Sequence, residues 1–257
     1  MTELFVAGVG GVLSADIAVP EHEREKRFYS RVLRTGERPL WREDLMNNMG
    51  MPIIGLGMQT AEYADLPLQW MPHIQVADVG ESVERALSLG GRALRHAKDK
   101  NGTSQWAVVS DPNAATFGLV PVIPAGAIPP LDSGDSTDAV GRISSIDLTA
   151  HDASAAADFY RQVVGWRVER VDDADDYTLL SETGSAVGRI RHAHGVNADL
   201  PHVWLIRLPV GDLAESLRCA RAEGGAVVQA IEGEQGQYMS AVVRDPVGTH
   251  LGLVALG

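Results

Sequence analysis

Two residues of this sequence have side chains suited to proton transfer and lie in short, largely apolar stretches. Asp16 lies within residues 13–19, and His73 lies within residues 70–76. A carboxylate and an imidazole that face one site can act as general acid and base, with the carboxylate orienting the ring. The alternative is a buried polar pair in which each group only satisfies the other. The residue types alone leave both interpretations open.

Periodicity predicts the elements that hold these two residues. Residues 13–19 alternate between apolar and small or polar side chains, which is typical of a strand, and residues 70–76 form a second strand. A helix is expected at 21–33, with Phe28, Tyr29 and Val32 on one face and acidic residues in its first turns. A further helix is expected at 80–89, ended by Gly90-Gly91. Strands are expected at 52–58, 105–109 and 116–121.

The chain repeats three landmarks in the same order. A Phe-Tyr pair follows the first strand at the same distance in both copies (28 − 14 = 14 and 159 − 145 = 14). The strand at 70–76 precedes Asp78 and a Gly-Gly pair, and residues 204–210 precede Asp212 and another Gly-Gly pair. Asp111-Pro112 and Asp245-Pro246 each precede a short strand. Three ordered matches indicate a duplication, over roughly residues 8–122 and 141–256.

The duplication predicts the domain organisation. We expect an N-terminal domain at 1–122, a linker at 123–140 that is rich in proline and small polar residues, and a C-terminal domain at 141–257. The fold class is α+β, with each domain a pair of βαβββ modules whose curved sheet surrounds a cavity.

The landmarks resemble those of the vicinal oxygen chelate superfamily, which includes glyoxalases, bleomycin-resistance proteins and ring-cleaving dioxygenases. The resemblance lies in the Phe-Tyr helix, the Gly-Gly helix and the Asp-Pro turn, and it spans nearly the whole chain. It is strongest to a two-domain subgroup with an acidic residue early in each first strand, here Asp16 and Asp147, and a tryptophan opening the next module, here Trp70 and Trp204. Such a fold hosts lyases, epimerases, dioxygenases and drug-binding proteins, so it does not define the reaction.

The resemblance also implies where a divalent metal would bind, and the residues there depart from the pattern. Histidine or glutamate ligands are expected on the first strand of each module and on the last strand. This chain has Ser14 and Ser145, Met71 and Leu205, and Gly118 and Gly252 at those positions. These side chains do not supply a site of the expected kind, so we expect no metal and no cofactor. A shift of two residues in one strand would place His73 at a ligand position.

Strand alternation predicts which side chains share a face with those positions. Asp16 and His73 are the candidate catalytic residues. The N-terminal cavity is favoured because methionines there form an adaptable apolar wall. Possible pairing of Asp147 with Arg207 is either structural or functional. The full set of candidate substrate-binding residues is Ser14, Met46, Met49, Met51, Met58, Trp70, Met71, Gln75, Thr116, Asp147, Arg207 and His250.

Composition limits the partners. The net charge of −12 disfavours nucleic acid and anionic membranes, and no apolar run approaches the roughly 20 residues of a membrane span. The single cysteine excludes an internal disulfide, as is typical of the cytoplasm. A small-molecule ligand is therefore the expected partner, with the chain a monomer or homodimer.

Three functions remain open. The first is a metal-independent lyase- or isomerase-like enzyme that uses Asp16 and His73 for isomerisation, elimination or cyclisation. The second is a protein that sequesters an antibiotic or hydrophobic metabolite without changing it. The third is a metalloenzyme, a lyase or dioxygenase, with displaced ligands such as Asp16, His73 or His250. Richness in Ala, Arg, Gly and Val suggests a GC-rich bacterial gene, where the first two roles associate with secondary metabolism.

Overall fold

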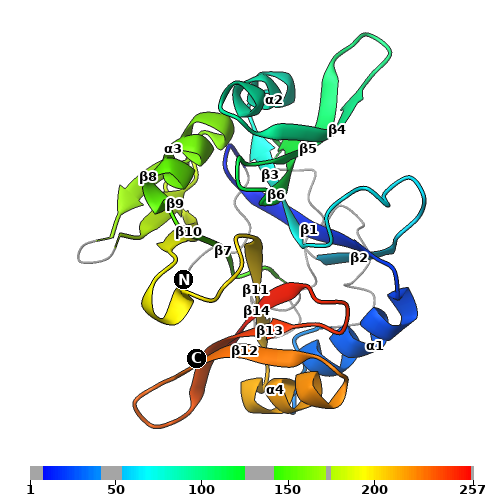
Figure 1. The fold of residues 1–257 in the computed structure, drawn as a ribbon, viewed down its shortest axis with the longest axis vertical. Helices are drawn as coiled ribbons and strands as arrows, with labels where there is room; N and C mark the ends of the chain where they lie inside the picture. Colours follow the sequence, from blue (N-terminus) through cyan, green and yellow to red (C-terminus); the bar gives the residue numbers. More distant parts are fainter. Residues whose placement is uncertain (1–7, 42–53, 125–141, 172–174, 256–257) are drawn as a thin grey trace. The chain divides into compact units, whose positions relative to one another are not determined.

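The computed structural model describes residues 8–41, 54–124, 142–171 and 175–255, drawn in colour in Figure 1. Met46, Met49, Met51 and all but the first two residues of the expected linker lie outside these ranges. The α+β fold class is confirmed, since the described residues form two sheets and four α-helices.

In the described residues, the N-terminal half contains a strand, a helix and a second strand, followed by one complete βαβββ module. Its elements are β1 (Val12–Val19), α1 (His22–Leu33), β2 (Ile54–Met58), β3 (Met71–Val76), α2 (Val79–Ser88), β4 (Arg92–Lys98), β5 (Ser104–Ser110) and β6 (Thr116–Pro121). The expected strands and helices at these places are confirmed. No residue range was predicted for β4, the first strand after α2, because its polar and apolar residues do not alternate regularly.

The C-terminal half shows the βαβββ order twice. Its elements are β7 (Ser145–Ala150), α3 (Ala153–Val164), β8 (Arg167–Arg170), β9 (Tyr177–Leu180), β10 (Ala186–His192), β11 (Trp204–Val210), α4 (Leu213–Ala222), β12 (Ala226–Glu232), β13 (Tyr238–Arg244) and β14 (His250–Ala255). A short 3-10 turn lies at Gly195–Asn197. The aspartates marked by the repeat are helix N-caps: Asp78 accepts from the Glu81 N–H at 2.9 Å and Asp212 from the Glu215 N–H at 2.8 Å.

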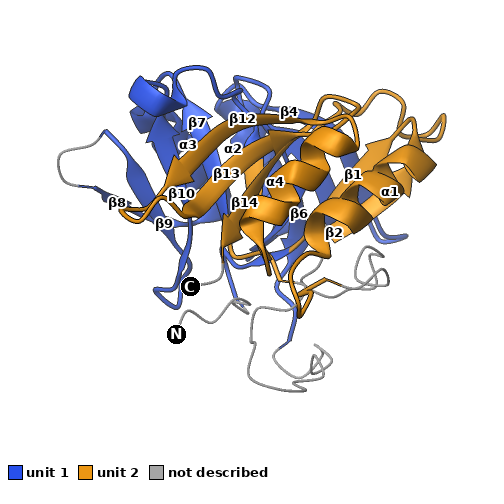
Figure 2. Cartoon of the chain, turned by 90° about the horizontal axis from the view of Figure 1, so that it is seen from below, with its two compact units in different colours: residues 1–13, 71–129, 146–204 blue, residues 14–70, 130–145, 205–257 orange. Residues whose placement is uncertain are grey.

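The chain packs as two compact units, and each unit takes segments from both halves of the sequence (Figure 2). Unit 1 comprises residues 1–13, 71–129 and 146–204, and unit 2 comprises residues 14–70, 130–145 and 205–257. A module from the N-terminal half therefore packs with a module from the C-terminal half inside each unit.

Unit 1 contains two groups of four strands and two helices. Strands β3 and β6 run parallel, and β6, β5 and β4 continue antiparallel. Strands β7 and β10 likewise run parallel, and β10, β9 and β8 continue antiparallel. Helix α2 packs beside α3. The apolar core of this unit includes Phe117, Tyr160 and Trp204, all at most 1% exposed.

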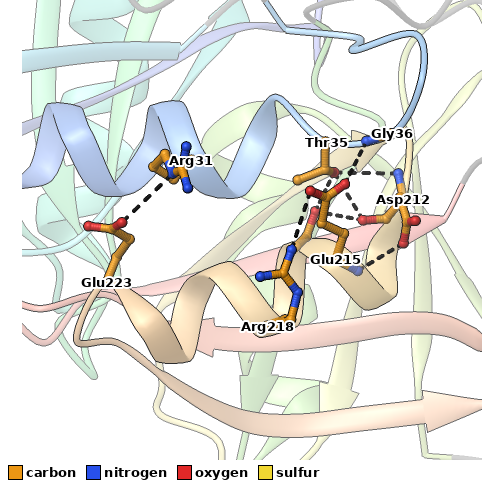
Figure 3. Close-up of polar contacts among 8 residues, drawn as sticks. Arg31, Thr35, Gly36, Asp212, Glu215, Arg218 and Glu223 are labelled. Carbon is orange, nitrogen blue, oxygen red and sulfur yellow. Dashed lines mark hydrogen bonds and ion pairs between the residues drawn. The ribbon is translucent and has the colours of Figure 1, made fainter.

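Unit 2 contains the parallel pair β1–β2 and the group β11, β14, β13 and β12, in which β11 and β14 are parallel and the others antiparallel. Helix α1 packs beside α4. Figure 3 shows how the end of α1 is held at the start of α4. The Thr35 hydroxyl donates to the Asp212 carbonyl oxygen at 2.9 Å, and the Gly36 N–H donates to the Glu215 carboxylate at 3.1 Å.

A buried hydrogen-bonded chain recurs in both units and joins residues from opposite halves. In unit 2 the Trp70 indole N–H donates to the Tyr29 hydroxyl at 3.0 Å, and that hydroxyl donates to Asp245 at 2.7 Å. In unit 1, Trp204 donates to Tyr160 at 3.0 Å, and Tyr160 donates to Asp111 at 3.2 Å. The tyrosine, tryptophan and aspartate of the repeated landmarks thus form one Trp–Tyr–Asp hydrogen-bonded chain in each unit.

None of the helices in the described residues is long and apolar enough to span a membrane.

Candidate functional site

Asp16 lies on the small, polar face of β1. Ala15, Ile17 and Val19 on the other face are at most 2% exposed and form core. Strand β2 pairs with β1 so that Gly55 is opposite Asp16 and Gly57 is opposite Ala18. Because glycine has no side chain, β2 adds no bulk beside the Asp16 carboxylate. This region of unit 2 is therefore lined by small residues around one acid.

His73 lies directly over a glycine in unit 1. Strands β3 and β6 place His73 opposite Gly118, and a Cβ atom added to Gly118 would lie 2.3 Å from His73 Cδ2. The imidazole therefore covers the backbone at the position where the resemblance expects a ligand-bearing side chain. A glutamate at 118 and the His73 ring cannot occupy this space together.

The C-terminal half repeats this arrangement with an arginine. In unit 2, β11 and β14 place Arg207 opposite Gly252, and a Cβ on Gly252 would lie 2.8 Å from Arg207 Cδ. Arg207 is 7% exposed. His250 is opposite Arg244 on β13. Burial lowers the pKa of His250 and the Arg244 charge lowers it further, while Asp245 acts in the opposite direction, so the neutral ring is favoured.

The aspartate of the C-terminal half is held in an ion pair that sequence analysis missed. In unit 1, Arg191 Nε lies 3.3 Å from an oxygen of Asp147, which is 3% exposed. Strand β10 runs parallel to β7, with Arg189 opposite Asp147 and Arg191 opposite Thr149. The alternating Arg-Ile-Arg at 189–191 is a strand pattern that places both arginines on one face, and this signal was present in the sequence.

Several predicted binding residues have structural partners. The Gln75 side chain donates to the Gly11 carbonyl oxygen at 3.4 Å and accepts from the Ile123 N–H at 3.0 Å. The Thr116 hydroxyl donates to the Ala114 carbonyl oxygen at 3.4 Å. Trp70 belongs to the buried chain with Tyr29 described above. Their contacts with a substrate remain predictions.

The remaining predicted residues differ in exposure. Ser14 and Met71 are 2% and 5% exposed, whereas Met58 at the end of β2 is 63% exposed. Asp16, Ser14, Met58, Trp70, Arg207 and His250 belong to unit 2, and His73, Met71, Gln75, Thr116 and Asp147 belong to unit 1. That Asp16 and His73 act on one substrate is therefore a proposal, taken up below.

Comparison with known proteins decides the family. The family model described as a glyoxalase-like domain matches the chain twice, at residues 14–120 and 145–254. The chain belongs to the glyoxalase-like domain family. The two matches confirm the tandem arrangement inferred from the repeat. Among curated proteins, none matches this glyoxalase-like chain.

Solved structures share the fold. The Mn(II)-bound glyoxalase from Novosphingobium aromaticivorans aligns with a TM-score of 0.55 and 14% identity, covering 97% of this chain and 83% of that one. The 2,2',3-trihydroxybiphenyl 1,2-dioxygenase from Sphingomonas wittichii RW1 aligns with a TM-score of 0.54 and 14% identity, covering 98% and 91%. A variant of homoprotocatechuate 2,3-dioxygenase from B. fuscum gives 0.57 and 11%, covering 98% and 73%. At these identities the likeness concerns the fold.

The ligand positions of this glyoxalase-like chain do not fit a divalent metal such as the Mn(II) of the Novosphingobium glyoxalase. Mn(II) is held by carboxylate and imidazole groups. Gly118 and Gly252 offer no donor, and the space that a side chain there would enter is taken by His73 and Arg207. Within the described ranges, His, Cys, Asp and Glu form no group of three or more that could hold a metal.

The close packing of His73 on Gly118 makes a prediction about stability. Gly118→Ala is expected to lower the free energy of unfolding by about 1–3 kcal/mol, because the ring must move away from the new methyl group. Urea denaturation of both proteins measures this difference. Gly57→Ala is the control, since its Cβ would meet only the Ile17 carbonyl oxygen at 3.7 Å. Equal losses in the two variants would show that the ring does not cover Gly118.

Proposed function

We propose that this chain is a metal-independent enzyme of the glyoxalase fold that acts on a small organic molecule, with Asp16 and His73 as its acid–base residues. The observation that carries the proposal is the His73 imidazole over Gly118, at the position of a metal ligand in the pattern that the chain resembles. An imidazole can take up and release a proton near neutral pH. His73 thus places a group that can carry a proton next to Gly118, the position at which the resemblance expects a metal ligand.

The surroundings of Asp16 support its role. Gly55 and Gly57 of the neighbouring strand leave the space beside Asp16 open on that side. Its counterpart Asp147 is paired with Arg191. The counterpart of His73 is Arg207, and a guanidinium group is not suited to act as a base. The presence of an imidazole at 73, where the C-terminal half has a guanidinium group, favours the N-terminal half as the catalytic one.

The chemistry that such a pair supports is a proton shift without a cofactor. A base takes a proton from one atom of the substrate, an acid returns a proton to another atom, and the electron pair moves between them. Isomerisation, elimination and cyclisation all fit this pattern. Ser14, Met71 and the methionines at 46, 49, 51 and 58 are proposed to contact the apolar part of the substrate.

Incubation of the full chain with a library of small organic metabolites tests this proposal. Mass spectrometry is expected to find a product formed in excess over enzyme, and dialysis against a chelator is expected to leave its rate unchanged within about twofold, because the proton shift runs on side chains alone.

The same experiment separates the rival functions. Stoichiometric retention of a ligand that is recovered unchanged would instead establish sequestration of an antibiotic or hydrophobic metabolite. Loss of turnover in chelator and its return on adding Mn(II) would instead establish a metalloenzyme with displaced ligands.

A further inference from the structure

The face of the sheet that carries Asp147 also carries two arginines. Register places Arg189 beside Asp147 and Arg191 beside Thr149 on β7 and β10, and Thr178 of β9 lies opposite Arg189. Paired residues of adjacent strands point to the same side of a sheet, so these five side chains share one face. Ile146, Leu148 and Ile190 alternate with them and are completely buried, which puts the core on the other face.

The two arginines have capacity for a further partner. Arg191 contacts Asp147 through Nε at 3.3 Å, and its side chain is 27% exposed. A guanidinium group has five N–H donors, so contact with one carboxylate leaves donors for another acceptor. Arg189 is exposed, and it has no ion pair within the described part of the chain. A guanidinium fork is well suited to the oxygens of a carboxylate or phosphate.

A buried hydroxyl lies next to this fork. Thr149 is 2% exposed, and its hydroxyl has no hydrogen-bond partner in the residues that the structure describes. Buried polar groups are rarely left without a partner, and such a group in a folded protein needs an explanation. A bound oxyanion would accept from this hydroxyl and from Arg191 at the same time.

The arginines are specific to the C-terminal half. Measured from the aspartate of the first strand, the positions of Arg189 and Arg191 correspond to Gly55 and Gly57, which are opposite Asp16 and Ala18. Another carboxylate of this module, Asp176, is engaged with the backbone N–H of His192 at 2.9 Å. The chain has a net charge of −12, and a local cluster of two arginines on it attracts anions.

We propose that the face of β7 and β10 is an oxyanion-binding site, in which Arg191, Arg189 and the Thr149 hydroxyl hold the carboxylate or phosphate group of a small molecule. Asp147 positions Arg191 through its Nε and leaves the outer edge of the guanidinium group for the ligand. The site goes beyond the proposed acid–base function, because it requires neither Asp16 nor His73.

Calorimetric titration of the full chain at low ionic strength, with inorganic phosphate and separately with benzoate, tests the site. Arg191→Gln is expected to raise the Kd of the bound anion about 10- to 100-fold, since a charge-assisted pair is lost. Thr149→Val, which keeps the side-chain shape, is expected to raise it about 3- to 10-fold. Arg191→Lys keeps the charge but loses the fork, and is expected to bind more weakly than the wild type.

Arg170→Gln is the matched control, because Arg170 is an exposed arginine of the same module that pairs with Asp175. It is expected to leave both Kd values unchanged. Binding of phosphate alone, or of benzoate alone, supports the site and identifies the group it takes. Failure of both probes to bind, or equal weakening by Arg170→Gln and Arg191→Gln, would overturn the proposal. Since binding is measured and not turnover, the result is independent of the catalytic proposal.

Discussion

Asp16→Asn and His73→Gln are each expected to lower kcat/KM by about 10²- to 10⁴-fold, the range that general acid–base groups contribute. Asparagine and glutamine keep the size and hydrogen-bonding capacity of the side chains but do not exchange protons. The measurement is steady-state turnover of the substrate identified in the metabolite screen, with circular dichroism to confirm that each variant is folded.

The duplication supplies the controls for this experiment. Asp147→Asn and Arg207→Lys change the corresponding positions of the C-terminal half, where the aspartate is paired with Arg191 and the arginine covers Gly252. Both are expected to keep kcat within about tenfold, because neither belongs to the reacting pair, although KM can change. Full turnover in Asp16→Asn would rule out its role, and loss of turnover only in the control variants would move the reaction to the other half.

Glu25→Gln is expected to make the protein more stable at alkaline pH. Glu25 of α1 is completely buried. Burial, followed by the negative charge of Asp245, raises its pKa from 4.5 to about 8. The folded state therefore keeps the proton over a pH range in which the unfolded chain has lost it. Stability that is fully present below pH 4.5 is lost as the pH rises towards about 8.

The expected gain follows from the size of this shift. One unit of pKa corresponds to about 1.4 kcal/mol, so the variant should exceed the wild type by up to about 4 kcal/mol at pH 9 and differ little at pH 4.5. Urea denaturation across this pH range gives the comparison. Glu23→Gln, an exposed residue of the same helix, is the control. Parallel pH profiles for wild type and Glu25→Gln would show that Glu25 does not titrate in this range.

The position in unit 1 that corresponds to Glu25 explains why we expect this pH-dependent loss of stability in unit 2 alone. The repeat places Ala156 where unit 2 has Glu25. Asp111, the counterpart of Asp245, instead accepts a contact of 2.8 Å from His202 Nε2, and His202 Nδ1 lies 2.9 Å from the Thr149 carbonyl oxygen. Both ring nitrogens thus face oxygen acceptors. The buried Tyr–Asp pair therefore has a histidine, His202, beside its aspartate in unit 1 and a glutamate, Glu25, beside its aspartate in unit 2.

The sequence was sufficient for the order of the elements. The alternation at 13–19 predicts β1, and the repeated landmarks predict two copies of one module pair, as the family model confirms. It was not sufficient for β4, in which polar and apolar residues are mixed. Nor did the sequence show that each unit combines segments from both halves of the chain. Tyr29 and Tyr160 have the same local sequence context, so nothing local specifies which of Asp111 and Asp245 each one meets.

The site was predicted in part for a similar reason. Alternation along a strand identified Asp16 and His73 as residues of the face away from the core. It did not identify what lies beside them, because pairing register is set by the whole sheet. The contact of His73 with Gly118 and the ion pair of Arg191 with Asp147 both depend on that register.

The interleaving of the two units has a consequence for synthesis on the ribosome. Most of unit 1 comes from residues 71–129 and 146–204, so it can assemble while the remaining chain is still being translated. Unit 2 needs residues 14–70 and residues 205–257, and its Tyr29 reaches Asp245 across 216 positions of sequence. Strand β1 and helix α1 are therefore synthesised well before β11 to β14, and they complete unit 2 only after those strands have left the exit tunnel. Slower translation between residues 70 and 205 would lengthen this interval.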